Sequence, residues 1–281
     1  MRKIIFSILF NLRNPSFKRI HKELKKNEKL SSRELKKIQL NKLRSILIYA
    51  FENSKFYRKK FEKEKINVYA LDIVSEYSKI IPIQKNDLIE SCLEIQTQGK
   101  HKFIAKTSGT SGQKLMFTKS ELWDSYNRAS IARGYSWHGA KFTDLKIYFW
   151  GFEFDFFKKV KTRVLDFLSL RVRIFTFNKI DLEFALKQRN KIEIIEGYSS
   201  LINQLAEYCL LNNIDFPNLK LVKATSETIL DNYRDNVKKA FNINLSSEYG
   251  SAEAGIIAFS CVKNKLHINL ESVFIEDYKN E

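Results

Sequence analysis

The chain has 281 residues, of which 44% are hydrophobic and 13% aromatic, so it can bury a sizeable core and is not a disordered segment. Its formal net charge of +17 could indicate a nucleic acid or an anionic membrane as partner. The lysines, however, are spread along the chain and interleaved with glutamates, as in residues 22–29 and 59–65. We therefore interpret the charge as a solvated surface and expect no nucleic-acid partner.

The start of the chain resembles a secretion signal only in part. Three residues that include Arg2 and Lys3 precede an apolar run over residues 4–10, but Asn11 and Arg13 interrupt it and no small-residue cleavage site follows. The run is also far below the roughly 20 residues that span a bilayer. We expect a cytoplasmic protein, with at most peripheral membrane contact through this segment.

The three cysteines, Cys92, Cys209 and Cys261, have no C-x-x-C spacing, which fits a reducing compartment. Cys261 and His267 could form half of a zinc site, because both are usable ligands, but structural zinc normally takes four. A pair of strand residues that face the core or a substrate pocket is the better interpretation.

The expected elements begin with a helix over residues 32–57, capped by Ser31 or Ser32, and a short helix over 85–92. Short apolar runs that are typical of buried strands then alternate with amphipathic helices. The expected strands are 103–106, 145–150, 172–177, 192–196, 219–224 and 243–247, and the expected helices are 119–138, 181–189, 199–211 and 229–241.

This alternation predicts an α/β fold with a doubly wound, mostly parallel sheet. Three final runs, 255–261, 266–270 and 273–275, have no helices between them and predict an antiparallel appendage. We expect residues 1–100 to form a helical region packed on an α/β core of residues 101–281.

Residues 107–114 read Thr-Ser-Gly-Thr-Ser-Gly-Gln-Lys, and their hydroxyls and unhindered N–H groups next to a lysine suit polyphosphate oxygens. Between two apolar runs, such a cluster is usually no more than a loop. The standard P-loop is excluded, because it needs four residues between its glycines, whereas Gly109 and Gly112 are separated by two. The dinucleotide fingerprint G-x-G-x-x-G does not occur.

Residues 248–255 read Glu-Tyr-Gly-Ser-Ala-Glu-Ala-Gly, with the ring of Tyr249 four residues before the carboxylate of Glu253. A ring can cover a nucleobase, and a carboxylate can hold the magnesium that accompanies phosphates; an ordinary exposed loop glutamate is the alternative. Residues 225–227 and 249–253 both follow predicted strands directly. Because ligands of parallel sheets bind at the carboxyl ends of strands, we expect a nucleotide there.

Taken together, the two segments resemble the phosphate loop T-S-G-T/S-T/S-G-x-P/K and the motif Y-G-x-x-E-x-G of the adenylate-forming superfamily, in its phenylacetate-CoA ligase/CapK-like branch. Residues 196–200 are similar to the family's G-Y-P-S turn, with Ser199 in place of proline. The other matches are residues 224–227 (its T-S/G-G-E segment), 257–261 with 266–268 (its strand, cysteine and L-H-I) and 49–57 (its opening Y-A-x-x-N-T-P-F-Y-R). The resemblance covers nearly the whole chain.

The resemblance implies that a carboxylic acid attacks the α-phosphorus of ATP to give an acyl-adenylate, from which an acceptor displaces AMP. It implies ATP and Mg²⁺ as cofactors and coenzyme A as one candidate acceptor, in capsular polysaccharide or secondary metabolism. The implied phosphate-binding residues are Thr107, Ser108, Gly109, Thr110, Ser111, Gly112 and Lys114; the adenine-binding residues are Ser226, Glu227, Tyr249, Gly250 and Ser251; and the metal ligand is Glu253. Lys114 and Glu253 would be catalytic, because charge develops on phosphoryl oxygens in the transition state.

The sequence departs from the family after His267, where it runs to Glu281 without an R-Y-x-x-G-D motif or a lid with a catalytic lysine. On this pattern we expect the C-terminal lid domain to be absent and the solitary chain to be impaired, unless a separate polypeptide supplies those parts. The alternative is a catalytically inactive protein that uses the inherited fold to bind a nucleotide, an acyl group or a partner.

Overall fold

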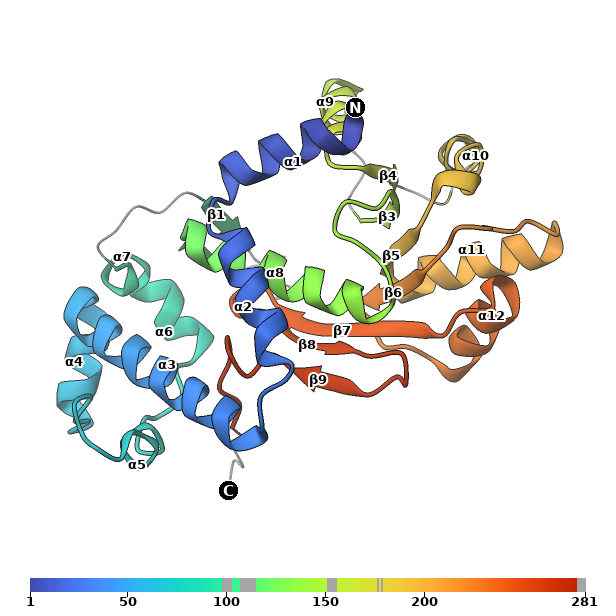
Figure 1. Cartoon of the computed structure of the whole chain (residues 1–281). Coiled ribbons are helices and arrows are strands. Elements are labelled where there is room, and N and C mark those ends of the chain that lie inside the picture. Colours follow the sequence, from blue (N-terminus) through green and yellow to red (C-terminus); the bar gives the residue numbers. More distant parts are fainter. Residues whose placement is uncertain (98–102, 107–114, 151–155, 176, 178, 277–281) are drawn as a thin grey trace.

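The computed structural model describes residues 1–97, 103–106, 115–150, 156–175, 177 and 179–276 (Figure 1). The strands are β1 (Phe103–Lys106), β2 (Met116–Lys119), β3 (Lys146–Phe149), β4 (Arg171–Ile174), β5 (Ile194–Tyr198), β6 (Leu221–Thr225), β7 (Leu245–Ser251), β8 (Gly255–Ser260) and β9 (Leu266–Ile268). The helices are α1 (Arg2–Arg13), α2 (Phe17–Asn27), α3 (Ser32–Asn53), α4 (Lys55–Lys63), α5 (Ile73–Tyr77), α6 (Lys85–Glu90), α7 (Cys92–Ile95), α8 (Glu121–Trp137), α9 (Phe156–Leu168), α10 (Lys179–Leu186), α11 (Ser199–Leu211) and α12 (Asp231–Phe241), with a 3-10 turn over Arg189–Lys191.

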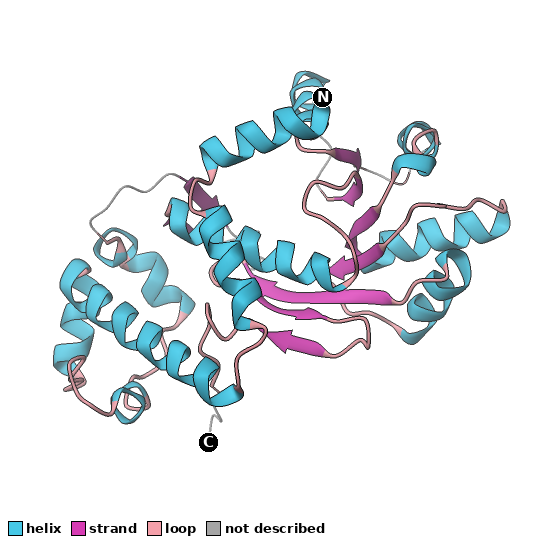
Figure 2. Ribbon diagram, viewed as in Figure 1, coloured by secondary structure: helices cyan, strands magenta, loops and turns pink. Residues whose placement is uncertain are grey.

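Within these residues the main sheet has seven strands in the order β4-β3-β5-β6-β7-β8-β9, as Figure 2 shows in magenta. The first five strands of this order are parallel, and β7, β8 and β9 pair antiparallel. The predicted doubly wound sheet and its antiparallel appendage are confirmed. The last predicted run, 273–275, is not a strand but an irregular segment.

Helices cover both faces of the main sheet. On one face, buried residues of α10, α11 and α12 such as Leu182, Ile202 and Val237 pack against Ile195 and Val222 of the strands. On the other face lies α8, whose Tyr135 packs with strand residues in a smaller cluster. The two faces differ in chemistry, because side chains alternate along each strand.

Several helices differ from the sequence-based expectation. The predicted helix over 32–57 is two helices, because Ser54 is extended, with φ −123° and ψ 123°, and its hydroxyl accepts the backbone N–H of Tyr57. Ser31 is the cap of α3, in a capping box with Glu34. No individual element was predicted at α1, α2, α5, α9 or β2, although residues 1–100 were expected to be a helical region.

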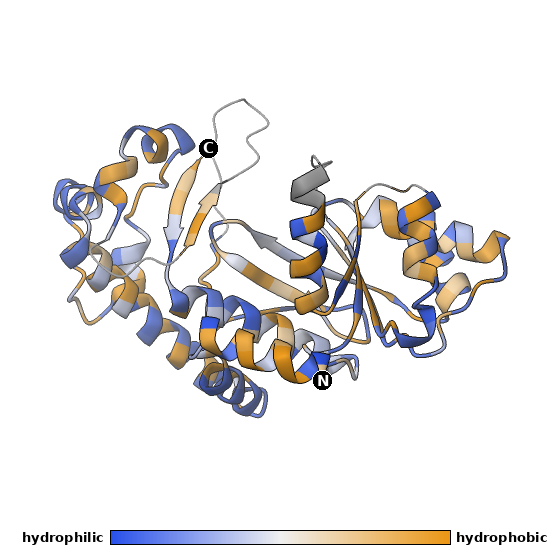
Figure 3. Ribbon diagram, turned by 90° about the horizontal axis from the view of Figure 1, so that it is seen from above, coloured by the Kyte–Doolittle hydropathy of each residue, from blue (hydrophilic) through white to orange (hydrophobic). Residues whose placement is uncertain are grey.

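The N-terminal segment that partly resembles a secretion signal is the amphipathic helix α1, which carries both hydrophobic and hydrophilic residues in Figure 3. Its Phe6 and Phe10 lie against Phe142, with ring centroids 6.0 and 5.0 Å apart, and Arg2 donates to the carbonyl of Phe167 in α9. None of the helices in the described residues is long and apolar enough to cross a bilayer. A cytoplasmic location stays a prediction.

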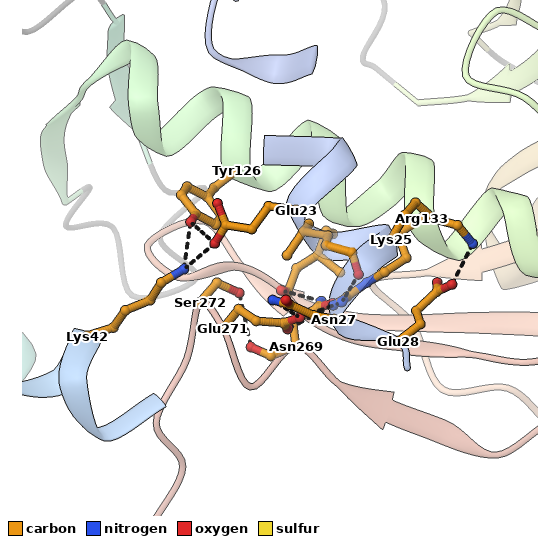
Figure 4. A network of polar contacts seen from close by, with 12 residues as sticks. Glu23, Lys25, Asn27, Glu28, Lys42, Tyr126, Arg133, Asn269, Glu271 and Ser272 are labelled. Carbon is orange, nitrogen blue, oxygen red and sulfur yellow. Dashed lines mark hydrogen bonds and ion pairs between the residues drawn. The ribbon is translucent and has the colours of Figure 1, made fainter. Parts of the chain in front are cut away.

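A buried polar network joins three segments that are distant in sequence (Figure 4). Arg133 of α8 donates to Glu271 at 2.8 and 3.1 Å and to Asn269 at 2.5 Å, and Asn27 at the end of α2 donates to Glu271 at 3.2 Å. Burial alone would raise the pKa of Glu271, but the hydrogen bond and charge of Arg133 lower it. The network fixes α2 and the C-terminal segment on α8.

The remaining N-terminal helices have a core of their own, which includes Leu43, Leu47 and Phe61. Phe274 of the C-terminal segment packs against this core, and the carbonyl of Val273 accepts from Gln39 at 2.8 Å. The C-terminal segment therefore connects the N-terminal helices to the α/β body.

Candidate functional site at the carboxyl ends of the strands

The residues predicted to bind the adenine lie in or just after two neighbouring strands of the main sheet, β6 and β7, toward the carboxyl ends of these strands. Tyr198 at the end of β5 is directly opposite Thr225 at the end of β6, and Ala224 is opposite Ser247 in β7. The segment that begins at Ser226 therefore leaves the sheet beside β7, which continues through Tyr249 to Ser251 and pairs there with β8.

Glu227 has a contact that the sequence analysis missed. Its carboxylate accepts the backbone N–H and the hydroxyl of Ser200, at 3.0 and 2.8 Å, and the hydroxyl of Ser199 at 3.2 Å. An anion is stabilised at this position because it lies at the N-terminus of α11. Ser226, which precedes it, has a left-handed φ of +67°. Glu227 thus fixes the turn between β5 and α11, and its role at the adenine edge stays a prediction.

The turn that joins Ser251, the last residue of β7, to Gly255, the first residue of β8, is as tight as the glycines in these strands suggest. A Cβ on Gly250 would lie 2.3 Å from the carbonyl oxygen of Gly255, and Gly255 itself has a φ of +75°. Ser251 accepts the backbone N–H of Ala254 at 3.0 Å inside the turn. Tyr249 is 63% exposed, and Glu253 is also exposed. The loop presents a ring and a carboxylate to the outside of the sheet edge.

The predicted phosphate-binding residues, Thr107, Ser108, Gly109, Thr110, Ser111, Gly112 and Lys114, lie outside the described residues. The flanking strands β1 and β2 are described and pair antiparallel, with Phe103 opposite Lys119. The ammonium group of Lys119 lies 3.7 Å from the ring centroid of Trp123.

Lys119 is a further candidate residue of this site. Burial lowers the pKa of Lys119, while the charges of Asp124 and Glu253 raise it. The strand that follows the predicted phosphate loop thus places a cation within electrostatic range of the predicted magnesium ligand. The sequence signal for Lys119 was its position two residues after the apolar run 115–117 and directly before Ser120, the cap of α8.

A cavity of about 460 Å³ lies between α1, α8, α9 and the face of the main sheet opposite α10, α11 and α12. Trp150 and Thr225 line it near the carboxyl ends of the strands, where the ring of Trp150 stacks on Tyr198 with centroids 4.9 Å apart. Aromatic and aliphatic residues form much of its wall, including Phe6, Leu9, Phe10, Ile131, Phe142 and Tyr148.

The floor of the cavity carries a charged cluster, which we define as Lys146, Arg171, Glu196, Lys223 and Glu248. The ammonium group of Lys223 lies 2.6 Å from a carboxylate oxygen of Glu248 and 3.3 Å from one of Glu196. That of Lys146 lies 3.9 Å from Glu196. Each member comes from a different strand, so the cluster crosses the five parallel strands.

The protonation states in the charged cluster are set by burial and by mutual pairing. Burial alone would raise the pKa of Glu196, but Lys146, Lys223 and the hydroxyl of Tyr135 lower it to about 2. Burial lowers the pKa of Lys146 to about 8, against the opposing effect of Glu196. Burial also disfavours the charge on Lys223, yet Glu248 and Glu196 raise its pKa. The sequence analysis missed these residues because it interpreted their strands as apolar runs.

Cys261 and His267 were interpreted as strand residues that face the core or a substrate pocket, but Cys261 lies just beyond β8 and is half-buried, and His267 does not face the core. Its side chain is exposed on β9, and its ring lies 5.4 Å from that of Trp137, since β9 is the edge strand of the sheet. Within the described residues, no group of three or more His, Cys, Asp and Glu side chains could hold a metal ion.

Comparisons with known proteins identify what this architecture is similar to. No family model matches the chain. The protein CapK of Staphylococcus aureus is 23% identical over 251 residues, which cover 86% of this chain and 56% of CapK. Solved structures of a 2-hydroxyisobutyryl-CoA ligase are also similar: one in the postadenylation state with 2-HIB-AMP has a TM-score of 0.64 at 17% identity and covers 84% of this chain and 53% of its own.

The open conformation of the same ligase, with 2-HIB-AMP and CoA, has a TM-score of 0.59 at 15% identity over 80% of this chain and 52% of that chain. The fold is that of the N-terminal domain of the adenylate-forming enzymes. The similarity to CapK agrees with the resemblance of the sequence motifs to the CapK-like branch. The chain spans about half the length of the relatives it matches.

Proposed function

We propose that the chain binds Mg²⁺-ATP at the carboxyl ends of β5, β6 and β7 and activates a carboxylic acid as an acyl-adenylate. The observation that carries this proposal is the position of Lys119, at the end of β2, within electrostatic range of the carboxylate of Glu253, in the turn after β7. Similarity to CapK and to an acid-CoA ligase supports the reaction class. A thiol such as coenzyme A would be the acceptor, and no comparison supports a separate lid polypeptide.

The residues present fit the magnesium ion that this reaction needs. In the described part of the chain, Glu253 makes no hydrogen bond or ion pair, and its carboxylate oxygens are ligands that Mg²⁺ prefers. The ion would neutralise charge on the phosphate oxygens. Lys119 would add a second positive charge, and the exposed ring of Tyr249 would cover the base.

The cavity next to this edge would hold the acid. Trp150 and Thr225 at its rim would direct the reacting carboxylate toward the nucleotide, and its apolar wall would bury the body of the acid and exclude water. No side-chain nucleophile is needed, because the acid itself attacks the α-phosphorus and pyrophosphate leaves. Positioning and electrostatic stabilisation are then the tasks of the protein.

Formation of the acyl-adenylate tests the proposal. The purified chain is mixed with ATP, Mg²⁺ and a panel of aromatic and aliphatic acids, and acyl-AMP is measured by mass spectrometry, which detects a single turnover. We expect acyl-AMP from at least one acid, only with Mg²⁺. Binding of ATP without acyl-AMP from any acid would support the inactive nucleotide-binding alternative, and no binding of ATP would contradict both.

Limited proteolysis tests the predicted phosphate loop separately. If residues 107–114 contact the β- and γ-phosphates, ATP should protect this segment from cleavage more than AMP does. Cleavage within residues 22–29, at the end of α2 and just after it, serves as the internal control, since it should not depend on the nucleotide. Equal protection by AMP and ATP would show that the loop does not contact those phosphates.

A further inference from the structure

We propose that the acid activated by this chain carries a second anionic group, and that Arg171 binds that group at the far end of the cavity. This inference rests on the proposed function, because it assigns the substrate class of the same site. It follows from the state of Arg171, from the charge of the cavity and from the distance between the two ends of the cavity.

Arg171 has a guanidinium group without a polar partner. In the part of the chain that the structure describes, it makes no ion pair and no side-chain hydrogen bond, and its Nε is buried without a partner. Its guanidinium carbon lies 4.6 Å from the ring centroid of Tyr148. Arg173, two residues further along β4 and on the same face, donates to Asp166 at 2.7 and 3.0 Å. Only Arg171 of this pair is left free for a ligand.

A guanidinium group whose Nε is buried and which has no polar partner is suited to bind an anion. Burial of a charged group without a partner is unfavourable, and the fork of N–H donors matches a carboxylate or phosphate bidentately. The stacking on Tyr148 holds the group in one orientation before a ligand arrives, so less side-chain freedom is lost on binding.

The cavity as a whole has an excess of positive charge. Its charged lining residues are Arg13, Arg128, Lys146, Arg171, Lys223, Glu196 and Glu248. Asp124, outside the lining, pairs with Arg128 at 2.9 Å and lies 3.7 Å from Arg13. The cations still outnumber the carboxylates when Asp124 is included, so a buried anion would lower the net charge of the site.

The position of Arg171 sets the spacing between the two anionic groups. Arg171 and its neighbour Lys146 are the first residues of β4 and β3, and they lie opposite each other in the sheet. Trp150 lies just beyond the carboxyl end of β3, and a strand of this length spans about 10 Å. An acid whose reacting carboxylate lies at the nucleotide edge would therefore place a second anion about 10 Å away, with an apolar body between them.

Binding of matched acids without ATP tests the inference. The probes are octanedioate against octanoate, and 3-(4-carboxyphenyl)propanoate against 3-phenylpropanoate, each titrated by calorimetry. We expect the wild-type protein to bind the diacid of at least one pair about tenfold more tightly, or by about 1.4 kcal/mol. Arg171→Met should abolish this preference, Arg171→Lys should retain part of it, and the exposed Arg189→Met should retain all of it.

In the binding experiment, the inference is overturned by equal or weaker binding of both diacids by the wild-type protein, by a preference that persists in Arg171→Met, or by no binding of any of the four acids. Failure of Arg171→Met to fold would be recognised by circular dichroism, and Arg171→Lys would then decide. Acyl-AMP formation is scored separately. Acyl-AMP from monoacids alone would overturn the inference and leave the proposed function standing, whereas tight diacid binding without acyl-AMP would do the reverse.

Discussion

The two faces of the main sheet differ in what their side chains do. On the face covered by α10, α11 and α12, residues such as Ile147, Ile195 and Val222 are fully buried in the largest hydrophobic core. On the opposite face, the same strands present Lys146, Glu196 and Lys223 beneath a cavity. Because side chains alternate along a strand, one set of strands supplies a stabilising face and a face available for ligands.

The charged face depends on the pairing of Lys146, Glu196, Lys223 and Glu248 within the cluster. Glu196 lies between two lysines and accepts from Tyr135, and Lys223 bridges Glu196 and Glu248. Buried charges of this kind contribute little net stability when paired, but loss of one partner is costly because the other charge stays buried. The apolar face responds instead to lost volume.

Glu196→Gln should have the largest effect on stability. It leaves Lys146 and Lys223 without their shared carboxylate, so we expect the free energy of unfolding to fall by about 3–5 kcal/mol. The control is the adjacent Ile195→Val on the opposite face, for which about 0.5–1.5 kcal/mol is expected. Urea unfolding measures both. A smaller loss for Glu196→Gln than for Ile195→Val would break the comparison between the faces.

Ile202→Ala tests the apolar face of the main sheet. Ile202 of α11 is fully buried against the apolar face, so its truncation should lower the free energy of unfolding by about 2–5 kcal/mol. Binding of acids in the cavity should not change, because Ile202 does not line it. Weaker acid binding in a folded Ile202→Ala protein would show that the two faces are not independent.

The pH dependence of the free energy of unfolding should also distinguish the charged face of the sheet from the apolar face. The pKa of Glu196 is lowered from 4.5 to about 2, so its contribution is fully present above pH 4.5 and is lost as the pH falls toward 2. Lys146 has a pKa lowered from 10.5 to about 8, so stability from this group rises with pH across that window. Urea midpoints should therefore fall less steeply in acid for Glu196→Gln than for the wild type. Parallel acid limbs would contradict the assignment.

Much of the fold could be predicted from the sequence, because apolar runs and amphipathic helices alternate so regularly. The position of Tyr249 and Glu253 near the carboxyl end of the parallel part of β7 followed from the same logic, although β7 extends through Tyr249 to Ser251 and does not end at residue 247 as predicted. The charged cluster was missed because Lys146, Glu196 and Lys223 lie in short runs that are mostly apolar, whereas Arg171 and Glu248 lie just outside the predicted strands 172–177 and 243–247. Alternation within the four-residue strands Lys-Ile-Tyr-Phe and Arg-Val-Arg-Ile was the signal that could have found it.

The cavity could not be predicted, because the sequence analysis placed no individual helix at α1 or α9, and these two helices enclose part of the cavity. The residues of α1 looked like part of a targeting segment, and α9 is rich in aromatic and β-branched residues that favour strands in isolation. Both are helical in the folded protein, where Phe6 and Phe10 of α1 pack against Phe142 and Leu165 and Leu168 of α9 line the cavity, and such long-range contacts override local preference.

Titration of Mg²⁺-ATP into the wild-type, Glu253→Gln and Glu62→Gln proteins by calorimetry tests the central claim most directly. Both glutamates are exposed, so each substitution should change the free energy of unfolding by less than about 0.5 kcal/mol. If the carboxylate of Glu253 holds the magnesium ion, Glu253→Gln should bind ATP about tenfold or more weakly when Mg²⁺ is present, while Glu62→Gln should bind like the wild type. Identical magnesium-dependent binding curves for all three proteins would contradict the account.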